Sequence, residues 1–222
     1  MDAGAGMNVL SEGFDWLTTS AHWHGEDGVP HRVLQHLGYT GLTVVIAAAI
    51  AIPIGLWIGH TGRFRGLAVV LTGALRALPT LGLVTLVVLW RGLGLTPPIT
   101  ALVVLAIPPL LAGAYAGLEA VDRNTIDAAR AIGMTEWQIL VKVEVPLAAR
   151  LIIGGFRSAV LQVIATATVA AYPGLGGLGR YLIDGIAVRD YPQTVAGSMV
   201  LIVMALVFDA VFAGAQRLAP RT

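Results

Sequence analysis

The chain has 222 residues, of which 56% are hydrophobic and only 12% are charged, with a formal net charge of +1. Its mean hydropathy is +0.79. A soluble domain typically carries about 25% charged residues, so this composition excludes an ordinary water-soluble protein and predicts one membrane domain. The chain contains no cysteine, which excludes disulfides and thiolate metal sites.

Residues 1–39 form a polar stretch with five acidic residues and one arginine. The stretch lacks both the basic start and the apolar core of a cleavable signal peptide. Trp16, Trp23 and Leu37 predict an interfacial helix with amphipathic anchors. The pair His22 and His24 is also compatible with a zinc or copper site, but no further ligand follows at a recognisable spacing. We therefore expect an external N-terminal segment and no metal site.

Five apolar segments follow, each close to the roughly 20 residues that cross a bilayer. They are residues 40–59, 66–90, 92–118, 158–172 with its upstream apolar turn, and 191–208. Arg76 and Pro79 interrupt the second segment. Lipid-exposed backbone must satisfy its own hydrogen bonds, so every span should be a helix. The sequence predicts an all-α membrane protein with about five transmembrane helices over residues 40–215 and a tail at 216–222.

The basic residues are distributed unevenly between the two sides of these spans. One set of loops holds eight of them: Arg63, Arg65, Arg123, Arg130, Lys142, Arg150, Arg217 and Arg221. The opposite set holds four: Arg32, Arg91, Arg180 and Arg189. The positive-inside rule places the first set in the cytoplasm. We therefore expect the loop at about 119–148 and the C-terminus in the cytoplasm, and the N-terminus outside.

The loop at about 119–148 is rich in charge, whereas residues 92–118 carry none. Its local pattern predicts two short helices joined at Gly133, because glycine tolerates a left-handed turn. Asn124 or Thr125 is the expected cap of the first helix and Thr135 that of the second. The expected apolar faces are Ile126, Ala129 and Ile132 in the first helix and Trp137, Leu140 and Val141 in the second. The loop is either a docking surface for a soluble partner or an ordinary solvated loop.

The same loop resembles a known family motif. Asp127, Ala128 and Ala129, then Gly133 after three residues and "VEVP" from Val143 after nine more, are similar to the EAA loop of ABC importer permeases, with Asp127 in place of the usual glutamate. The stretches "RALPTLGLVTL" from Arg76 and "TATVAAYPGLGGLGRYLIDGI" from Thr166 resemble the osmoprotectant branch, which takes up glycine betaine, choline, carnitine or proline betaine. The resemblance covers residues 38–209 and implies a type I ABC importer permease fold (MetI-like).

The resemblance implies that the loop is a coupling helix that contacts a separate ATPase. The residues that it assigns to ATPase coupling are Asp127, Ala128, Ala129, Gly133, Met134, Thr135, Glu136, Trp137 and Ile139. It further implies an extracytoplasmic solute-binding protein, a second permease copy or paralogue, and a place in the bacterial cell membrane. The only lysine, Lys142, lies outside any Walker A pattern, so we expect no ATP binding here. ATP and magnesium should belong to the partner, with no cofactor, enzymatic activity or nucleic-acid binding in this chain.

Two other groups of residues are candidates for the transport pathway. Thr80, Gln162, Thr166 and Thr168 are polar residues in or beside spans that could line the path, or that could satisfy helix packing instead. Gly174, Gly176, Gly177 and Gly179 include a G-x-G-x-x-G match, but no strand precedes it, so a dinucleotide site is excluded. We favour a tight external turn over a gate for these glycines.

Alternatives remain for both packing and function. The pairs Gly55 with Gly59 and Gly113 with Gly117 predict close helix packing, within one subunit or between two. The rival functions are a permease for methionine or another amino acid, and a secondary transporter, which normally shows two related repeat halves. No such repeat is visible, and no G-x-S-x-G or HExxH pattern supports a membrane enzyme.

Overall fold

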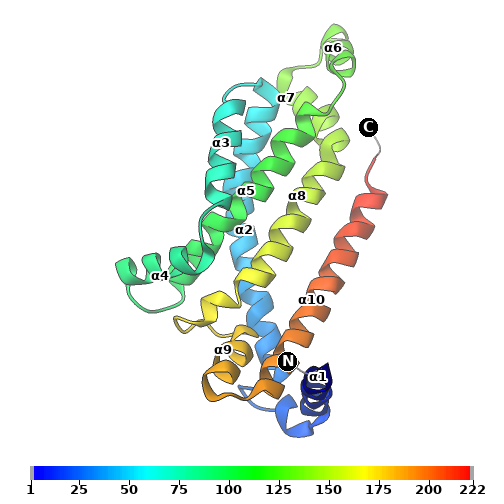
Figure 1. Cartoon of the computed structure of the whole chain (residues 1–222). Helices are drawn as coiled ribbons and strands as arrows, with labels where there is room; N and C mark the ends of the chain where they lie inside the picture. The colour runs from blue at the N-terminus through cyan, green and yellow to red at the C-terminus, as the bar shows by residue number, and fades with distance from the viewer. Residues whose placement is uncertain (1–2, 221–222) are drawn as a thin grey trace. The chain divides into compact units, whose positions relative to one another are not determined.

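The structure is a computed structural model that describes residues 3–220, with side chains from residue 9 onward. Within that range it contains helices and turns but no strand, in the order that Figure 1 shows. The elements are α1 (Ala3–Thr18), η1 (Ser20–Trp23), α2 (Val29–Thr61), α3 (Arg65–Arg76), α4 (Thr80–Arg91), α5 (Thr96–Glu119), α6 (Arg123–Ala131), α7 (Glu136–Ile139), η2 (Leu140–Glu144), α8 (Val145–Thr166), η3 (Val169–Ala171), α9 (Gly179–Val188) and α10 (Tyr191–Leu218). The prediction of an all-α protein is confirmed.

Three helices among the described residues are long and apolar enough to cross a membrane: α2, α5 and α10. A fourth span results if α3 and α4 are counted together as one broken helix. The expected number of about five is therefore approximate. The remaining predicted span corresponds to α8, a helix of 22 residues that carries Arg150 and Arg157.

Several predicted boundaries were wrong. The segment 66–90 is two helices, because Pro79 lacks an amide donor and disfavours a helical conformation at the residue before it. Helix α2 begins at Val29, inside the segment predicted as an external N-terminal region, and α10 continues to Leu218. Helix α8 begins at Val145 and ends at Thr166. It therefore both starts and ends earlier in the chain than the predicted span, which was residues 158–172 with the apolar turn upstream of them.

The chain divides into two compact units. The first comprises Met1–Thr43, Pro79–Leu102 and Gln162–Val207. Its core includes a cluster of Leu102, Ala167, Ala170 and Leu175, against which Tyr39 packs, and a second cluster around Val84, Val87 and Ala101. Burial of these apolar side chains is what holds α4, η3 and the turn after η3 in place.

The second unit comprises Val44–Leu78, Val103–Leu161 and Phe208–Thr222. Its helices approach closely at glycines. A Cβ atom built on Gly55 would lie 2.6 Å from the Cβ of Ala114, and one on Gly113 would lie 2.7 Å from the Cα of Gly155. These contacts join α2 to α5 and α5 to α8. The predicted small-residue pairs therefore pack helices within one subunit.

Candidate functional site

The predicted coupling loop, called here the coupling segment (residues 119–148), lies in the second unit. As expected, it contains two short helices, α6 and α7, joined through Gly133, whose φ of +87° lies in the left-handed region. Figure 1 shows α6 and α7 next to each other. An L-residue at this φ would be strained, so glycine fits the position that the chain requires.

The two helix caps differ in how well the sequence predicted them. Thr135 caps α7, as predicted, in a capping box where its hydroxyl accepts from the Gln138 amide at 3.3 Å and the Gln138 side chain accepts from the Thr135 amide at 2.9 Å. The prediction for α6 was wrong. Asp122 is the cap, and its carboxylate accepts from the Asn124 amide at 3.0 Å.

A small apolar core supports the coupling segment. Val121, Ile126, Ala129 and Ile139 are buried, with Met134, Val143 and Leu147 packed against them. Residues that were predicted to lie on the apolar faces of the two helices are instead exposed. Ile132 is 80% exposed and Trp137 is 71% exposed. Helix α7 has only four residues before the π-helical turn η2, so the 3.6-residue spacing used to predict its apolar stripe does not hold.

An exposed charge network links the two coupling helices across Gly133. Arg130 donates to both carboxylate oxygens of Glu136, at 2.8 and 3.0 Å, and to Asp127 at 3.2 Å. The hydrogen bonds with Glu136 raise the pKa of Arg130, and the same bonds lower the pKa of Glu136 below its usual value. Asp127, the residue at the EAA glutamate position, is thus paired within its own helix.

The structure adds two residues that the sequence did not single out. Glu144, in η2, is 2% exposed, and its Oε2 lies 2.5 Å from Nδ1 of His60 near the end of α2. The other ring nitrogen of His60 lies 3.4 Å from Glu136. A buried carboxylate normally needs such a partner. The only sequence signal was a glutamate flanked by two valines, and nothing in the sequence connects it to a histidine 84 residues away.

The glycine turn (residues 173–179) lies in the first unit. Gly174 and Gly177 have φ values of +101° and +83°, and Gly179 starts α9. Leu175 and Leu178 are fully buried. The Gly177 amide donates to the side chain of Gln35 at 3.0 Å. These residues form a tight turn, as predicted, while the gating role that was weighed against it stays a prediction.

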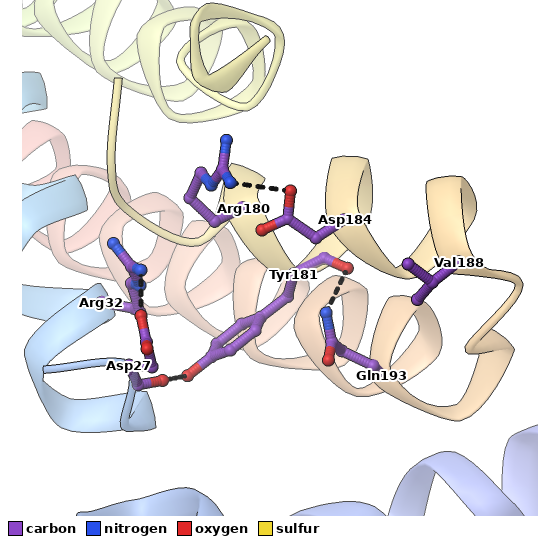
Figure 2. Close-up of a pocket in the computed structure, with 7 residues that line it drawn as sticks. All are labelled: Asp27, Arg32, Arg180, Tyr181, Asp184, Val188 and Gln193. Carbon is purple, nitrogen blue, oxygen red and sulfur yellow. Dashed lines mark hydrogen bonds and ion pairs between the residues drawn. The ribbon is translucent and has the colours of Figure 1, made fainter. Parts of the chain in front are cut away.

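A polar pocket of about 390 Å³ lies between the start of α2, α9 and α10, as Figure 2 shows. In its wall Tyr181 donates to the Asp27 carbonyl, Asp27 pairs with Arg32, and Arg180 lies 2.9 Å from Asp184. Burial raises the pKa of Tyr181 to about 12. Because these polar groups bond to one another across the wall, the contacts hold α9 against the start of α2.

The four predicted path residues lie in the first unit, and two of their hydroxyls bond to backbone carbonyls near the end of α8. Thr166 donates to the Gln162 carbonyl at 2.8 Å and Thr168 to the Ala165 carbonyl at 2.6 Å. Thr80 is the first residue of α4. Such bonds satisfy a hydroxyl in an apolar helix without requiring a solute. A role in the path stays a prediction.

The N-terminal histidines have structural contacts. His22 stacks on Trp16 with 3.7 Å between ring centroids, and its Nδ1 lies 2.8 Å from the Trp16 carbonyl. His36 is fully buried in α2 and contacts the Ile164 carbonyl at 3.0 Å. Among residues 9–220, no three potential ligands gather closely enough to hold a metal ion.

Comparisons with known proteins extend this picture. Residues 51–222 match the family model of the binding-protein-dependent transport system inner membrane component. The osmoprotectant import permease OsmW of Salmonella typhimurium is 34% identical over 79% of this chain and 84% of that protein. The carnitine transport permease OpuCB of Listeria monocytogenes is 31% identical over 79% of this chain and 80% of that protein.

Solved structures show the same fold. A chain of the MetNI methionine ABC transporter in an inward-facing conformation superposes with a TM-score of 0.76 at 19% identity, covering 87% of this chain and 96% of that one. An amino acid ABC transporter solved with histidines superposes with a TM-score of 0.65 at 18% identity, covering 98% of both chains. At this identity the likeness concerns the fold alone. Together with the family match, it shows that the chain belongs to the binding-protein-dependent transport system inner membrane components.

Proposed function

We propose that this chain is the membrane permease subunit of an ABC importer for osmoprotectants such as glycine betaine, carnitine, choline or proline betaine. The observation that carries the proposal is the similarity to permeases named for carnitine, choline, glycine betaine and osmoprotectant transport, at 27–34% identity. A permease for methionine or another amino acid is the second candidate, since the two structural neighbours are transporters named for such solutes but share only the fold. The sequence identity of these two neighbours to this chain is lower than that of the osmoprotectant permeases.

In the proposed mechanism a separate ATPase docks on the coupling segment. The support is that the segment exposes both apolar and charged side chains: Ile132 and Trp137 are mostly exposed, and the paired Asp127, Arg130 and Glu136 are exposed in the same short stretch. Large exposed apolar residues rimmed by polar ones mark protein interfaces. The ATPase would bind and hydrolyse ATP with magnesium, and its movement would reach the spans through α7 and η2.

The remaining partners follow from membership of a binding-protein-dependent transport family. An extracytoplasmic protein would deliver the solute, and two permease copies or a copy and a paralogue would enclose the path. The excess of arginine on one side favours a cytoplasmic coupling segment and C-terminus, with the N-terminus outside. The path would include Thr80, Gln162, Thr166 or Thr168, and the external glycine turn serves as a structural turn.

Reconstitution tests the substrate assignment. The permease should be purified with its ATPase, placed in proteoliposomes with the solute-binding protein, and supplied with radiolabelled glycine betaine, carnitine, choline or methionine. We expect ATP-dependent uptake of at least one osmoprotectant and none of methionine. Uptake of methionine alone would overturn the assignment, and uptake driven by an ion gradient without ATP would overturn the importer class. A protein-free liposome serves as the control.

A further inference from the structure

A basic pocket of about 380 Å³ lies between α8 and α10 in the second unit. Its lining residues are Arg150, Arg157, Ala213, Gln216 and Arg217. Arg150 and Arg157 are seven residues apart and share one face of α8, while the other three share one face of α10. The volume lies in the range of small-molecule sites.

The pocket reaches deep into the proposed membrane region. Arg157 lies twelve residues from the start of α8 and Asp209 nine residues from the end of α10, which is about 18 and about 14 Å along each helix. Ionisable residues at such depth face the protein interior or a water-filled cavity and commonly mark a solute pathway.

The deep end of the pocket is held in a fixed arrangement. Arg157 makes two bonds to the Asp209 carboxylate, at 2.7 and 2.8 Å, and donates to Gln216 Oε1 at 3.2 Å. Gln216 in turn donates to the Arg150 carbonyl at 3.1 Å. Its side chain crosses directly over Gly154, where a Cβ atom would lie 2.8 Å from Gln216 Nε2. Specific hydrogen bonds therefore fix the pocket wall, so the pocket is not a chance gap between helices.

The pocket also has unused capacity for an anion. Arg150 donates from Nη2 to the Ala219 carbonyl at 3.4 Å, but its Nε is buried and has no hydrogen-bond partner among residues 3–220. Arg217 is exposed at the pocket edge. The lining thus presents three arginines, with Asp209 as the carboxylate that pairs with Arg157. Guanidinium groups match the geometry of a carboxylate.

We propose that this pocket binds the carboxylate of a zwitterionic solute on its way to the cytoplasm, with Arg150 as the main contact. The proposal rests on the proposed function. Glycine betaine and carnitine carry the required carboxylate, whereas choline has the ammonium group alone, so the pocket discriminates between these solutes.

Equilibrium binding tests the site without the solute-binding protein. The permease–ATPase complex in phosphatidylethanolamine nanodiscs should bind radiolabelled glycine betaine, and unlabelled glycine betaine or acetate should displace it, whereas choline should not. Arg150→Gln should weaken binding about tenfold, the effect of losing a hydrogen bond to a charged group. Arg217→Gln, at the exposed edge, should weaken it less and provides a second variant if Arg150→Gln does not fold. Arg63→Gln removes an exposed arginine elsewhere and should bind like the wild type.

Each of the following outcomes of the binding experiment would contradict the proposed carboxylate site or the proposed function. Equal displacement by choline, or unchanged binding by both Arg150→Gln and Arg217→Gln, removes the carboxylate assignment. Displacement by inorganic phosphate or by added phosphatidylglycerol, with no effect of acetate, makes the pocket a phosphate or lipid site instead. Uptake in proteoliposomes without detectable binding refutes the pocket and leaves the proposed function intact. Failure of the wild type to carry any osmoprotectant refutes the proposed function itself.

Discussion

The coupling segment and the glycine turn at residues 173–179 both break a helical path at a glycine, but the surrounding side chains differ. Each joins helices through a glycine with positive φ, Gly133 in one and Gly174 and Gly177 in the other. In the coupling segment the neighbouring large side chains point outward, with Ile132 80% and Trp137 71% exposed. In the turn, Leu175 and Leu178 are fully buried. A break that exposes apolar groups suits docking, whereas one that buries them suits a fixed connection.

The two regions also differ in what anchors them. Side-chain charges hold the coupling segment, through Arg130 with Glu136 and through His60 with Glu144. Backbone amide bonds close both breaks: Gly133 donates to the Arg130 carbonyl at 3.0 Å in the coupling segment, and Gly174 donates to the Ala171 carbonyl at 3.1 Å in the turn. Charged side chains can exchange partners when another protein arrives. Residues 173–179 include no charged side chain, which favours movement at the coupling segment over movement at the turn.

The largest effect should come from breaking the buried anchor of the coupling segment. His60→Ala leaves the buried Glu144 carboxylate without its partner, and breaking such a pair typically costs about 3 kcal/mol. The Tm of the purified complex in detergent should fall clearly. His60→Ala combined with Glu144→Gln removes the uncompensated charge as well and should recover much of the loss. If single and double variants have equal Tm values, the pair does not anchor the segment.

The next effect concerns the exposed face of the coupling segment. Trp137→Ala should leave the Tm nearly unchanged, because the ring is mostly exposed, but should weaken ATPase binding by about 2 kcal/mol, or roughly thirtyfold in Kd. Surface plasmon resonance with the immobilised ATPase measures this. Trp90→Ala is the matched control, since Trp90 is 75% exposed on α4. A similar loss for both variants would show that any exposed tryptophan matters and that the coupling segment has no special role.

Substituting two glycines with alanine distinguishes the cost of backbone strain from the cost of poor side-chain packing. Gly133→Ala and Gly177→Ala both force an alanine into the left-handed region, at about 1–2 kcal/mol. A Cβ on Gly133 meets nothing within 4 Å, whereas one on Gly177 would lie 3.1 Å from His36 Nδ1. We expect Gly177→Ala to lower the Tm more. Gly133→Ala should instead reduce ATP-coupled uptake while membrane insertion, measured by carbonate extraction, stays normal. The reverse order of Tm values would contradict the proposed contrast.

Local signals made much of this structure predictable. The apolar segments and the hydrogen-bonding needs of backbone in lipid predicted the helices, and Gly133 and Thr135 predicted the break and cap that separate α6 from α7. These features depend on a few neighbouring residues. The cap at Asp122 was missed because Asn124 and Thr125 are also good caps, and only the backbone conformation chooses among them.

Features that depend on distant residues were not predictable. His60 and Glu144 meet only after α2 and η2 have packed, and no local pattern links them. The exposure of Ile132 follows from where α6 ends, and that of Trp137 follows from the switch to a π-helical turn after four residues of α7. In the pocket between α8 and α10, the seven-residue spacing of Arg150 and Arg157 places both on one helix face, but no local pattern links Arg157 to Asp209, which is 52 residues away.

The smallest effect is the pH dependence of the link between Arg130 and Glu136. The pKa of Glu136 is lowered from 4.5 by hydrogen bonds from Arg130, so its contribution to stability is fully present above pH 4.5 and is lost as pH falls through the lower folded value. The Tm difference between wild type and Glu136→Gln should therefore stay constant from about pH 8 to about pH 5.5 and shrink only in stronger acid. The difference should be small, because both side chains are half exposed and salt screens them. A Tm difference that changes near neutral pH would contradict this account of the link between Arg130 and Glu136.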